Sequence, residues 1–199
     1  MKNESYNMED LKRLRELTGS SIALCKQALG ETGGNIEKAI LKLKKSSEAL
    51  AEKKLGRSTR AGVVEAYIHG NKKVGVLLEL RCETDFVART EKFQNLAHDI
   101  ALHIAGLKPI YVRSDQVSEE AKKEAESIFR EEAVRQAQGK PDLTEKILEG
   151  KMNAHFKDNS LLSQLFVKDP SITVEELIKQ NSGNFGEKIE ITRVSRYEL

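Results

Sequence analysis

The sequence predicts an α+β fold, and three observations carry this prediction. Apolar residues recur at helical spacing over residues 8–45 and again from Thr90 onward. Between these stretches, from Gly62 to Cys82, they alternate with the two-residue period of a strand, and the alternation returns from Gly186 to Tyr197. Helices that precede and follow a few strands predict a small antiparallel sheet of about three strands backed by helices.

Residues 8–45 are predicted to form three short helices. The segments Thr18-Gly19-Ser20 and Thr32-Gly33-Gly34-Asn35 supply the capping and left-handed conformations that tight helical turns require. A module of this size buries little apolar area. We therefore expect it to be marginally stable by itself and to need contacts with a partner or with the rest of the chain. Three apolar stripes define its helices: Met8, Leu11, Leu14 and Leu17; Ile22, Cys25, Ala28 and Leu29; Ile36, Ala39, Ile40 and Leu43.

A basic segment follows these helices. Residues 46–60 are rich in Ala, Lys and Glu, which favours a helical linker. We therefore expect a three-helix domain (residues 1–48), a basic linker (49–60) and an α+β core domain (61–199).

The predicted sheet begins with a hairpin. Val63 to His69 and Val74 to Cys82 are rich in strand-forming residues, and Gly70-Asn71 between them is typical of a tight turn. The alternating segment near the end of the chain is the economical third strand, because an isolated hairpin is marginal in water. Its spacing leaves open whether the face with Ile189 and Ile191 or the face with Glu190 and Val194 is buried.

Four helices are predicted in the core domain. The first begins after Thr90 as N-cap, covers the hairpin, and stops near Gly106 and Pro109. Two more span Ser118 to Gln138 and Thr144 to about Phe156, and Thr173-Val174-Glu175-Glu176 is a capping box that opens a short fourth.

Composition points away from several classes of protein. The 199 residues are 39% hydrophobic and carry 33 basic and 31 acidic side chains, a net charge of +2 that is too balanced for an obligate nucleic-acid binder. No apolar run approaches the roughly 20 residues of a membrane span. Cys25 and Cys82 lack any zinc or disulfide pattern, so we expect no metal, no cofactor and a reducing cytoplasm.

Catalytic patterns are weak. No phosphate-binding loop of the GxxxxGK[ST] or GxGxxG type appears. His98 and His103, five residues apart on a helix, point about 140° apart and so cannot chelate one metal, and His103 is expected at the edge of the core. Cys82 and His69 can be drawn as a thiol and a base, but no orienting third group is visible.

Thr84-Asp85-Phe86-Val87 stands where the strand pattern gives way to the helical pattern. By spacing alone, Thr84 or Asp85 caps a helix while Phe86 and Val87 anchor the turn in the core. The alternative is that the acid and the aromatic ring project from an edge of the fold and wedge open a partner.

Several segments, in one order, carry a resemblance: LRELTG at Leu14–Gly19, GGNIEKAI at Gly33–Ile40, VGVLLELRCETDFVARTEKFQNLAHDIALHIA at Val74–Ala105, and FVKDPSITVEELI at Phe166–Ile178. Over roughly residues 8–199 the chain resembles the short form of the bacterial elongation factor Ts family. That family is the guanine-nucleotide exchange factor of elongation factor Tu, the GTPase that delivers aminoacyl-tRNA to the ribosome. The resemblance implies a soluble cytoplasmic homodimer that is not an enzyme and whose N-terminal helices are similar to a ubiquitin-associated domain.

The resemblance also implies roles for individual residues. Thr84, Asp85, Phe86 and Val87 fall on the family's loop that enters the GTPase beside its magnesium site, with Phe86 as the wedge and Asp85 perturbing the site. A weaker contribution is implied for the N-terminal module through Ile22, Ala23 and Lys26. Here the chain has Ile22-Ala23-Leu24 where the family often has Met-Met-Asp. Ser195 stands where some short members carry a cysteine, so a homodimer would lack a covalent tie there.

Two alternatives stay open at this point. The chain could be an RNA- or ribosome-associated protein that binds phosphates through the seven basic residues of the segment from Lys42 to Arg60. It could also be a thiol enzyme centred on Cys82.

Overall fold

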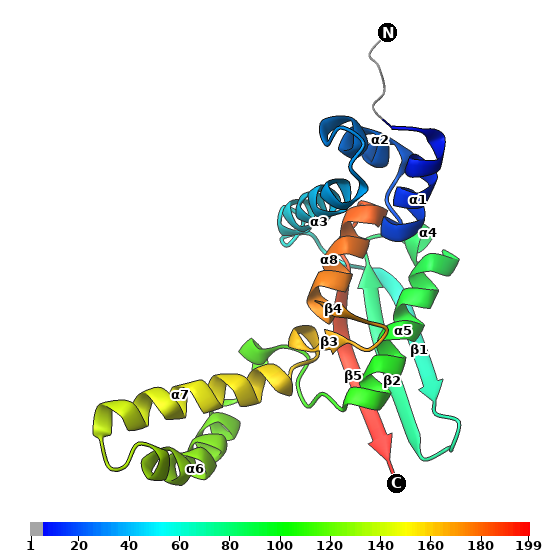
Figure 1. Ribbon diagram of the computed structural model, residues 1–199. Helices are drawn as coiled ribbons and strands as arrows, with labels where there is room; N and C mark the ends of the chain where they lie inside the picture. The colour runs from blue at the N-terminus through cyan, green and yellow to red at the C-terminus, as the bar shows by residue number, and fades with distance from the viewer. Residues whose placement is uncertain (1–5) are drawn as a thin grey trace. The chain divides into compact units, whose positions relative to one another are not determined.

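The computed structural model describes residues 6–199 (Figure 1). It confirms the α+β class, with helices around a three-stranded sheet and a further two-stranded sheet. The chain divides into two compact units, and β1, β2 and β5 contribute residues to both. The first unit comprises residues up to Val63, Leu80–Gln94 and Glu176–Thr192; the second comprises Val64–Glu79, Asn95–Glu175 and Arg193–Leu199. The division into domains at residues 48 and 60 stays a prediction.

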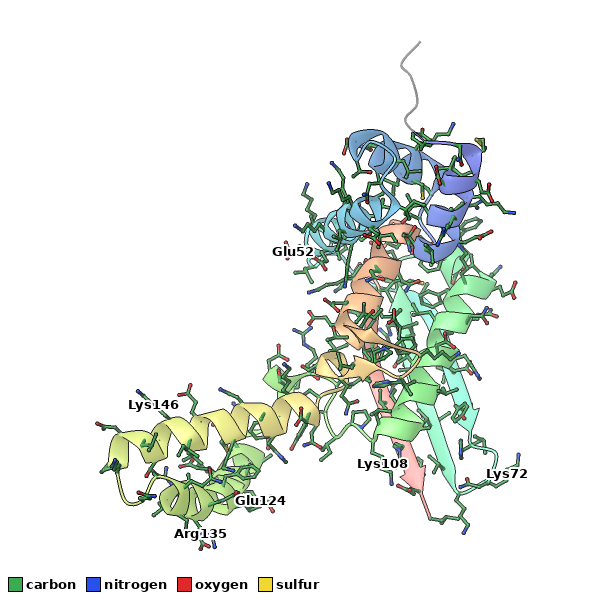
Figure 2. The ribbon with its side chains drawn as sticks, in the orientation of Figure 1. Glu52, Lys72, Lys108, Glu124, Arg135 and Lys146 are labelled. Atoms are coloured by element: carbon green, nitrogen blue, oxygen red, sulfur yellow. The ribbon has the colours of Figure 1, made fainter. Side chains whose placement is uncertain are left out.

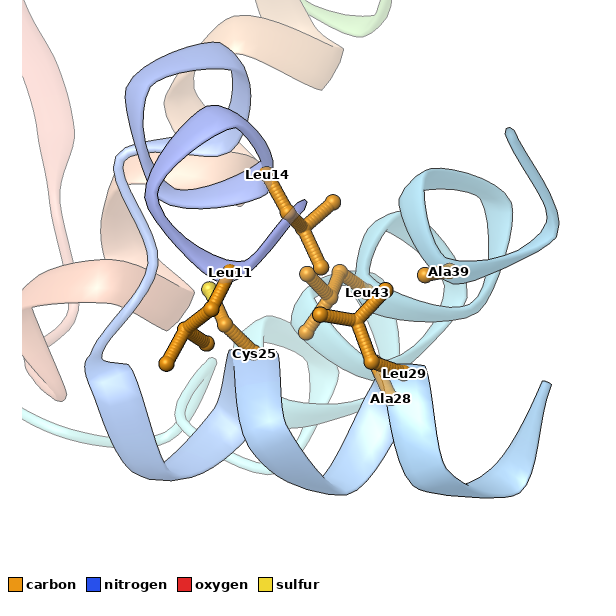
Figure 3. Close-up of a cluster of buried hydrophobic side chains, with 7 residues drawn as sticks. All are labelled: Leu11, Leu14, Cys25, Ala28, Leu29, Ala39 and Leu43. Atoms are coloured by element: carbon orange, nitrogen blue, oxygen red, sulfur yellow. The ribbon is translucent and has the colours of Figure 1, made fainter. Parts of the chain in front are cut away.

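The first unit begins with the three predicted helices, α1 (Met8–Thr18), α2 (Ile22–Glu31) and α3 (Ile36–Glu52). Asn7, Ser21 and Asn35 cap them by accepting hydrogen bonds from backbone N–H groups of the first turn, as short polar side chains do. The helices enclose a small apolar core, shown in Figure 3: Leu11, Leu14, Cys25, Ala28, Leu29, Ala39 and Leu43.

The first predicted stripe is wrong at both ends. Leu11 and Leu14 are buried, whereas Met8 is 73% exposed and Leu17 is 60% exposed. A step of three residues falls 60° short of a full helical turn, so a stripe of nine residues drifts about 180° around the helix. Met8 and Leu17 therefore lie on opposite sides of the buried pair.

The predicted helical linker is helical in its first half. Helix α3 continues to Glu52, after which turns at residues 53–56 and an irregular stretch lead to the first strand. Gly183 of α8 (Val174–Phe185) lies close to α3, since a Cβ atom there would stand 2.7 Å from the Cβ of Ser47. A glycine at this position lets α8 and α3 of the first unit approach closely.

The sheet has the order β1-β2-β5, with β1 at Ala61–Ile68, β2 at Val74–Cys82 and β5 at Glu190–Glu198. Neighbouring strands run in opposite directions (Figure 1), which confirms the hairpin and its third strand. Every second residue of β2, from Val74 to Cys82, is buried. On β5, Val194 and Arg196 are half-buried while Arg193, Ser195 and Tyr197 are exposed, so over residues 193–197 the face with Val194 is the inner one; near the start of the strand, Ile189 is buried and Ile191 is half-buried.

Helix α5 (Glu91–Leu107) adjoins the sheet, as predicted. In the second unit, Glu65 of β1 accepts a hydrogen bond from His98 at 2.9 Å, and Arg196 of β5 donates one to the carbonyl oxygen of Ala105 at 3.1 Å. The buried face of α5 includes Ile100, Ala101 and Ile104. Thr90 accepts a hydrogen bond from the N–H of Phe93, which confirms its role as N-cap.

The rest of the second unit holds a helical hairpin and the small sheet. Helices α6 (Glu119–Gln136) and α7 (Pro141–Asp158) pack against each other and confirm two predicted helices, with α7 starting earlier because Pro141 suits a first turn. Charged side chains such as Glu124, Arg135 and Lys146 point outward from the hairpin (Figure 2). Strands β3 (Leu165–Phe166) and β4 (Asp169–Thr173) were not predicted.

Candidate functional site

The Thr84–Val87 segment forms a short helix with one outward face. Thr84 is the N-cap of α4 (Asp85–Ala88), and its hydroxyl accepts a hydrogen bond from the N–H of Val87 at 3.4 Å. Val87 and Ala88 are buried, whereas the side chain of Phe86 is 84% exposed. The prediction from spacing, a capped helix with Phe86 and Val87 in the core, is therefore right for Thr84 and Val87. It is wrong for Phe86, whose ring projects into solvent.

Phe86 does not project alone. Asp85, Arg89 and Thr90 line the same shallow hollow beside its ring. An acid, a base and an exposed aromatic thus share one surface of the first unit. Monomeric proteins normally bury a ring of this size, and exposed aromatic residues are enriched at protein interfaces.

The backbone that leads into α4 is held by Glu187, which lies between α8 and β5. One carboxylate oxygen of Glu187 accepts hydrogen bonds from the N–H groups of Glu83 and Thr84, each at 3.0 Å. The other oxygen accepts a hydrogen bond from the Thr84 hydroxyl at 2.6 Å. In return, the side chain of Glu83 accepts a hydrogen bond from the N–H of Lys188 at 2.6 Å. Two segments remote in sequence are thereby joined through their carboxylates.

The role of Glu187 was not predicted from the sequence. It is a single acidic residue after a glycine, outside any periodic pattern, and about a hundred positions separate it from the loop that it holds. The available signal was Gly186, which has a φ of 75° and so permits the left-handed turn that ends α8.

The predicted residues of the N-terminal module lie on the surface of α2. Ile22, Ala23 and Lys26 are all exposed, and Ile22 is 48% exposed. Just before α2, Asn184 of α8 donates a hydrogen bond to the carbonyl oxygen of Thr18 and accepts one from the hydroxyl of Ser20. The module is thus tied, within the first unit, to the same α8–β5 junction that holds the loop.

The second unit has a separate apolar surface. Val64, Ile68, Leu77 and Tyr197 lie on the side of β1, β2 and β5 opposite to the buried residues of β2, and each is at least 49% exposed. A pocket at one end of this face is lined by Ile68, Leu77 and Tyr197. Contiguous exposed apolar residues of this kind mark interaction surfaces.

Neither cysteine is suited to catalysis. Burial, and then the charge of Glu187, raise the pKa of the Cys82 thiol to about 11, so the reactive thiolate is scarce at neutral pH. His69 bonds to Val74 at the other end of β2, so it is not placed to act on Cys82. Burial also raises the pKa of Cys25. Within residues 6–199, no cluster of three His, Cys, Asp or Glu side chains is arranged to hold a metal ion.

Four of the seven basic residues between Lys42 and Arg60 make contacts within the protein itself. Lys42 pairs with Glu31, Lys44 with Glu176, and Arg57 with Glu83. Lys54 is 5% exposed and donates a hydrogen bond to the carbonyl oxygen of Ser182 at 3.0 Å. Burial and, next, the nearby Arg57 lower the pKa of Lys54. These pairings argue against a continuous phosphate-binding surface, which needs cations turned outward.

In the part of the chain that the structure describes, no helix combines the length and the apolar character that crossing a membrane requires.

Comparisons with known proteins bear on the whole chain. The sequence model of one family, described as Elongation factor TS, matches residues 18–199. A protein of Coprothermobacter proteolyticus named Elongation factor Ts is 47% identical over 190 residues, which cover 95% of either chain. Proteins of the same name from Thermotoga petrophila and Carboxydothermus hydrogenoformans are 43% and 46% identical, over 97% and 95% of this chain and 96% and 87% of their own.

Proposed function

The chain belongs to the elongation factor Ts family, and from that premise we propose that it binds elongation factor Tu carrying GDP and promotes the release of the nucleotide. The observation that carries the proposal is the ring of Phe86, which is 84% exposed on a helix whose other face is buried. Because the exposed ring packs little against its own chain, a partner can bury it without breaking contacts within the fold.

Phe86 is proposed to act as a wedge. Inserted into an apolar gap between helices of the GTPase, it would shift the helix that orders the water ligands of the bound magnesium ion. That ion neutralises the charge of GDP phosphates, so its displacement weakens nucleotide binding. Asp85, at the start of α4, would add a negative charge or a hydrogen bond beside the metal site. Thr84 and Val87 serve the same site by capping and anchoring α4.

The coupling needs no covalent chemistry, and we propose that the chain is not an enzyme in the sense of making or breaking covalent bonds. Binding is reciprocal: a factor that weakens GDP a thousandfold is itself weakened a thousandfold by GDP, which corresponds to about 4 kcal/mol. The partner's own GTPase site supplies the nucleotide and the metal, so the chain acts without a cofactor. It would do so in the cytoplasm, where translation takes place.

The N-terminal module is proposed as a second point of attachment. Ile22, Ala23 and Lys26 form an exposed face of α2 with an apolar part and a cation. Such a face can add affinity without touching the nucleotide site, because linking two contacts makes the second one intramolecular.

A homodimer is also proposed, through the open face of the sheet. Val64, Ile68, Leu77 and Tyr197 would leave water together if two copies packed these faces against each other. An isologous arrangement buries the same residues on both copies and closes the assembly at two chains. Residue 195, on the exposed side of β5, is a serine, so this dimer would hold without a disulfide at that position.

The test is direct. Elongation factor Tu is loaded with fluorescent GDP, excess unlabelled GDP is added, and the release rate is measured with and without the purified chain at micromolar concentration. The proposal expects release that speeds up with the concentration of the chain and then saturates. A release rate that does not depend on the chain would overturn it, and retention of the chain by RNA at moderate salt would favour the RNA-binding alternative.

A further inference from the structure

Phe86 stands on a helix too short to fix its own direction. Helix α4 has four residues, fewer than an isolated helix needs to persist in water. The direction of the ring therefore depends on what holds the N-terminus of α4, and the carboxylate of Glu187 supplies three of the hydrogen bonds there.

We propose that Glu187 is a positioning residue for nucleotide exchange: its carboxylate fixes the backbone of Glu83 and Thr84 and so holds Phe86 in the orientation that enters the partner. The inference rests on the proposed exchange function and deepens it. Glu187 would touch neither the nucleotide nor the metal and would act through the loop alone.

The chemistry at Thr84 makes this contact specific. A threonine hydroxyl has one proton, and here it is donated to Glu187 at 2.6 Å. The lone pairs of the same oxygen are then turned toward the N–H of Val87, which completes the cap of α4. Hydrogen bonds to an ionised carboxylate are stronger than neutral ones, so the anion orients the hydroxyl and the hydroxyl orients the helix.

Glu187 is itself fixed on its other side. The carbonyl oxygen of Glu187 accepts a hydrogen bond from the hydroxyl of Ser182, and the carbonyl oxygen of Ser182 accepts one from the buried Nζ of Lys54. The bond from Lys188 to Glu83 closes the arrangement, because each segment accepts with a carboxylate what the other donates from its backbone. A rotation of Glu187 away from the loop would break several of these bonds together.

The test compares Glu187→Gln with the wild-type chain. Glutamine is uncharged, and its single acceptor oxygen can keep the two N–H groups only by turning the NH₂ toward Thr84, so the bond donated by the Thr84 hydroxyl is lost or reversed and the remaining bonds lose their charged acceptor. We expect the maximal rate of GDP release to fall about tenfold, as for the loss of one charge-assisted hydrogen bond. The backbone amide protons of Glu83 and Thr84 should move upfield in ¹H–¹⁵N spectra, because they lose a charged acceptor.

Thr84 tests the same contact from the loop side. Thr84→Val, which removes the hydroxyl at constant shape, should lower the release rate, and Thr84→Ser, which keeps it, should restore the rate. In the Glu187→Gln background, Thr84→Val should cost less than it does alone, because the bond it removes is already weakened. If Glu187→Gln folds poorly, the two Thr84 variants alone still test the contact between Thr84 and Glu187.

Two controls separate positioning from general damage. Asn184→Ala removes bonds from the same junction to Thr18 and Ser20, and it should leave the amide shifts of Glu83 and Thr84 unchanged. Glu119→Gln removes a carboxylate that pairs with Lys122 on α6, and it should leave both the amide shifts and the release rate unchanged.

The outcomes are distinguishable. Full release by Glu187→Gln and by Thr84→Val overturns the inference and leaves the exchange function intact. A release rate lowered by Glu187→Gln with unmoved amide shifts also overturns it, because the effect would then not pass through the loop. No release by the wild-type chain overturns the proposed function, and the amide shifts then decide the Glu187 contact by themselves.

Discussion

Protonation of His103 should weaken the fold at acid pH. The imidazole lies on α5, is fully buried, and serves the β3–β4 hairpin in two ways. Its Nδ1 accepts a hydrogen bond from the N–H of Val167 at 3.2 Å, and its Nε2 lies 3.0 Å from Oε1 of Gln164, where it donates. The bond from Val167 requires the neutral ring, because a second ring proton on Nδ1 would face the N–H of Val167, whereas Nε2 donates to Gln164 in either protonation state.

The magnitude follows from the burial. Burial lowers the pKa of His103 below its ordinary value of 6.5, against a smaller opposite effect of Gln164. The unfolded chain therefore binds more protons than the folded one below pH 6.5, and stability falls as the pH drops through that value. If the ring stays neutral in the folded protein throughout, the free energy of unfolding falls by at most about 1.4 kcal/mol between about pH 7.5 and about pH 5.5.

The assay is urea unfolding at those two pH values for the wild-type chain and for His103→Gln. Glutamine offers an acceptor and a donor but does not titrate, so the other histidines contribute equally to both chains. The wild type should lose up to about 1.4 kcal/mol more than the variant on acidification. Equal losses would refute the reasoning, since they would show that His103 titrates alike in the folded and unfolded states.

Three further predictions concern other residues. Phe86→Ala should leave the midpoint of thermal unfolding nearly unchanged because the ring is exposed, whereas Val87→Ala, which truncates a buried neighbour, should cost about 2 kcal/mol; similar shifts in calorimetry would contradict the assignment of the two faces. Cys82, with its pKa of about 11, should react with a disulfide reagent at mildly alkaline pH only after unfolding, and rapid labelling of the native chain would disprove its enclosure. Leu77→Glu should convert the proposed dimer to monomer in sedimentation equilibrium, and a wild-type chain that sediments as a monomer at high concentration would remove the dimer.

The hairpin could be predicted from sequence because its signals are local. Alternation over β1 and β2 and a Gly-Asn pair between them are enough to place a turn. The detail differs: the positive φ falls on Lys72, at 60°, while the side chain of Asn71 accepts a hydrogen bond from the N–H of Lys73. Because the side chain of Asn71 closes the turn, the left-handed backbone conformation is taken by the next residue, Lys72.

Other features leave no local signal. Strand β3 has two residues, too few to show a period, and Pro170 in β4 argues against a strand by composition. The exposure of Phe86 could not be settled from spacing, because a four-residue helix has one buried face and either Phe86 or its neighbours could occupy it. Val87 and Ala88 take that face, and the ring is turned outward. The contact of Glu187 with Thr84 depends on two distant segments meeting, which periodicity does not encode.

The account depends most on the ring of Phe86 as the group that drives GDP release. Its most direct test is the rate of release from elongation factor Tu at saturating concentrations of the wild-type chain and of Phe86→Ala. If the contact of the ring is worth about 2 to 4 kcal/mol, as for an interface hot spot, and is made only in the state from which GDP leaves, the variant should release GDP roughly 30 to 900 times more slowly than the wild type even at saturation, or at the spontaneous rate if that is faster. Equal acceleration by the two folded chains would contradict the account.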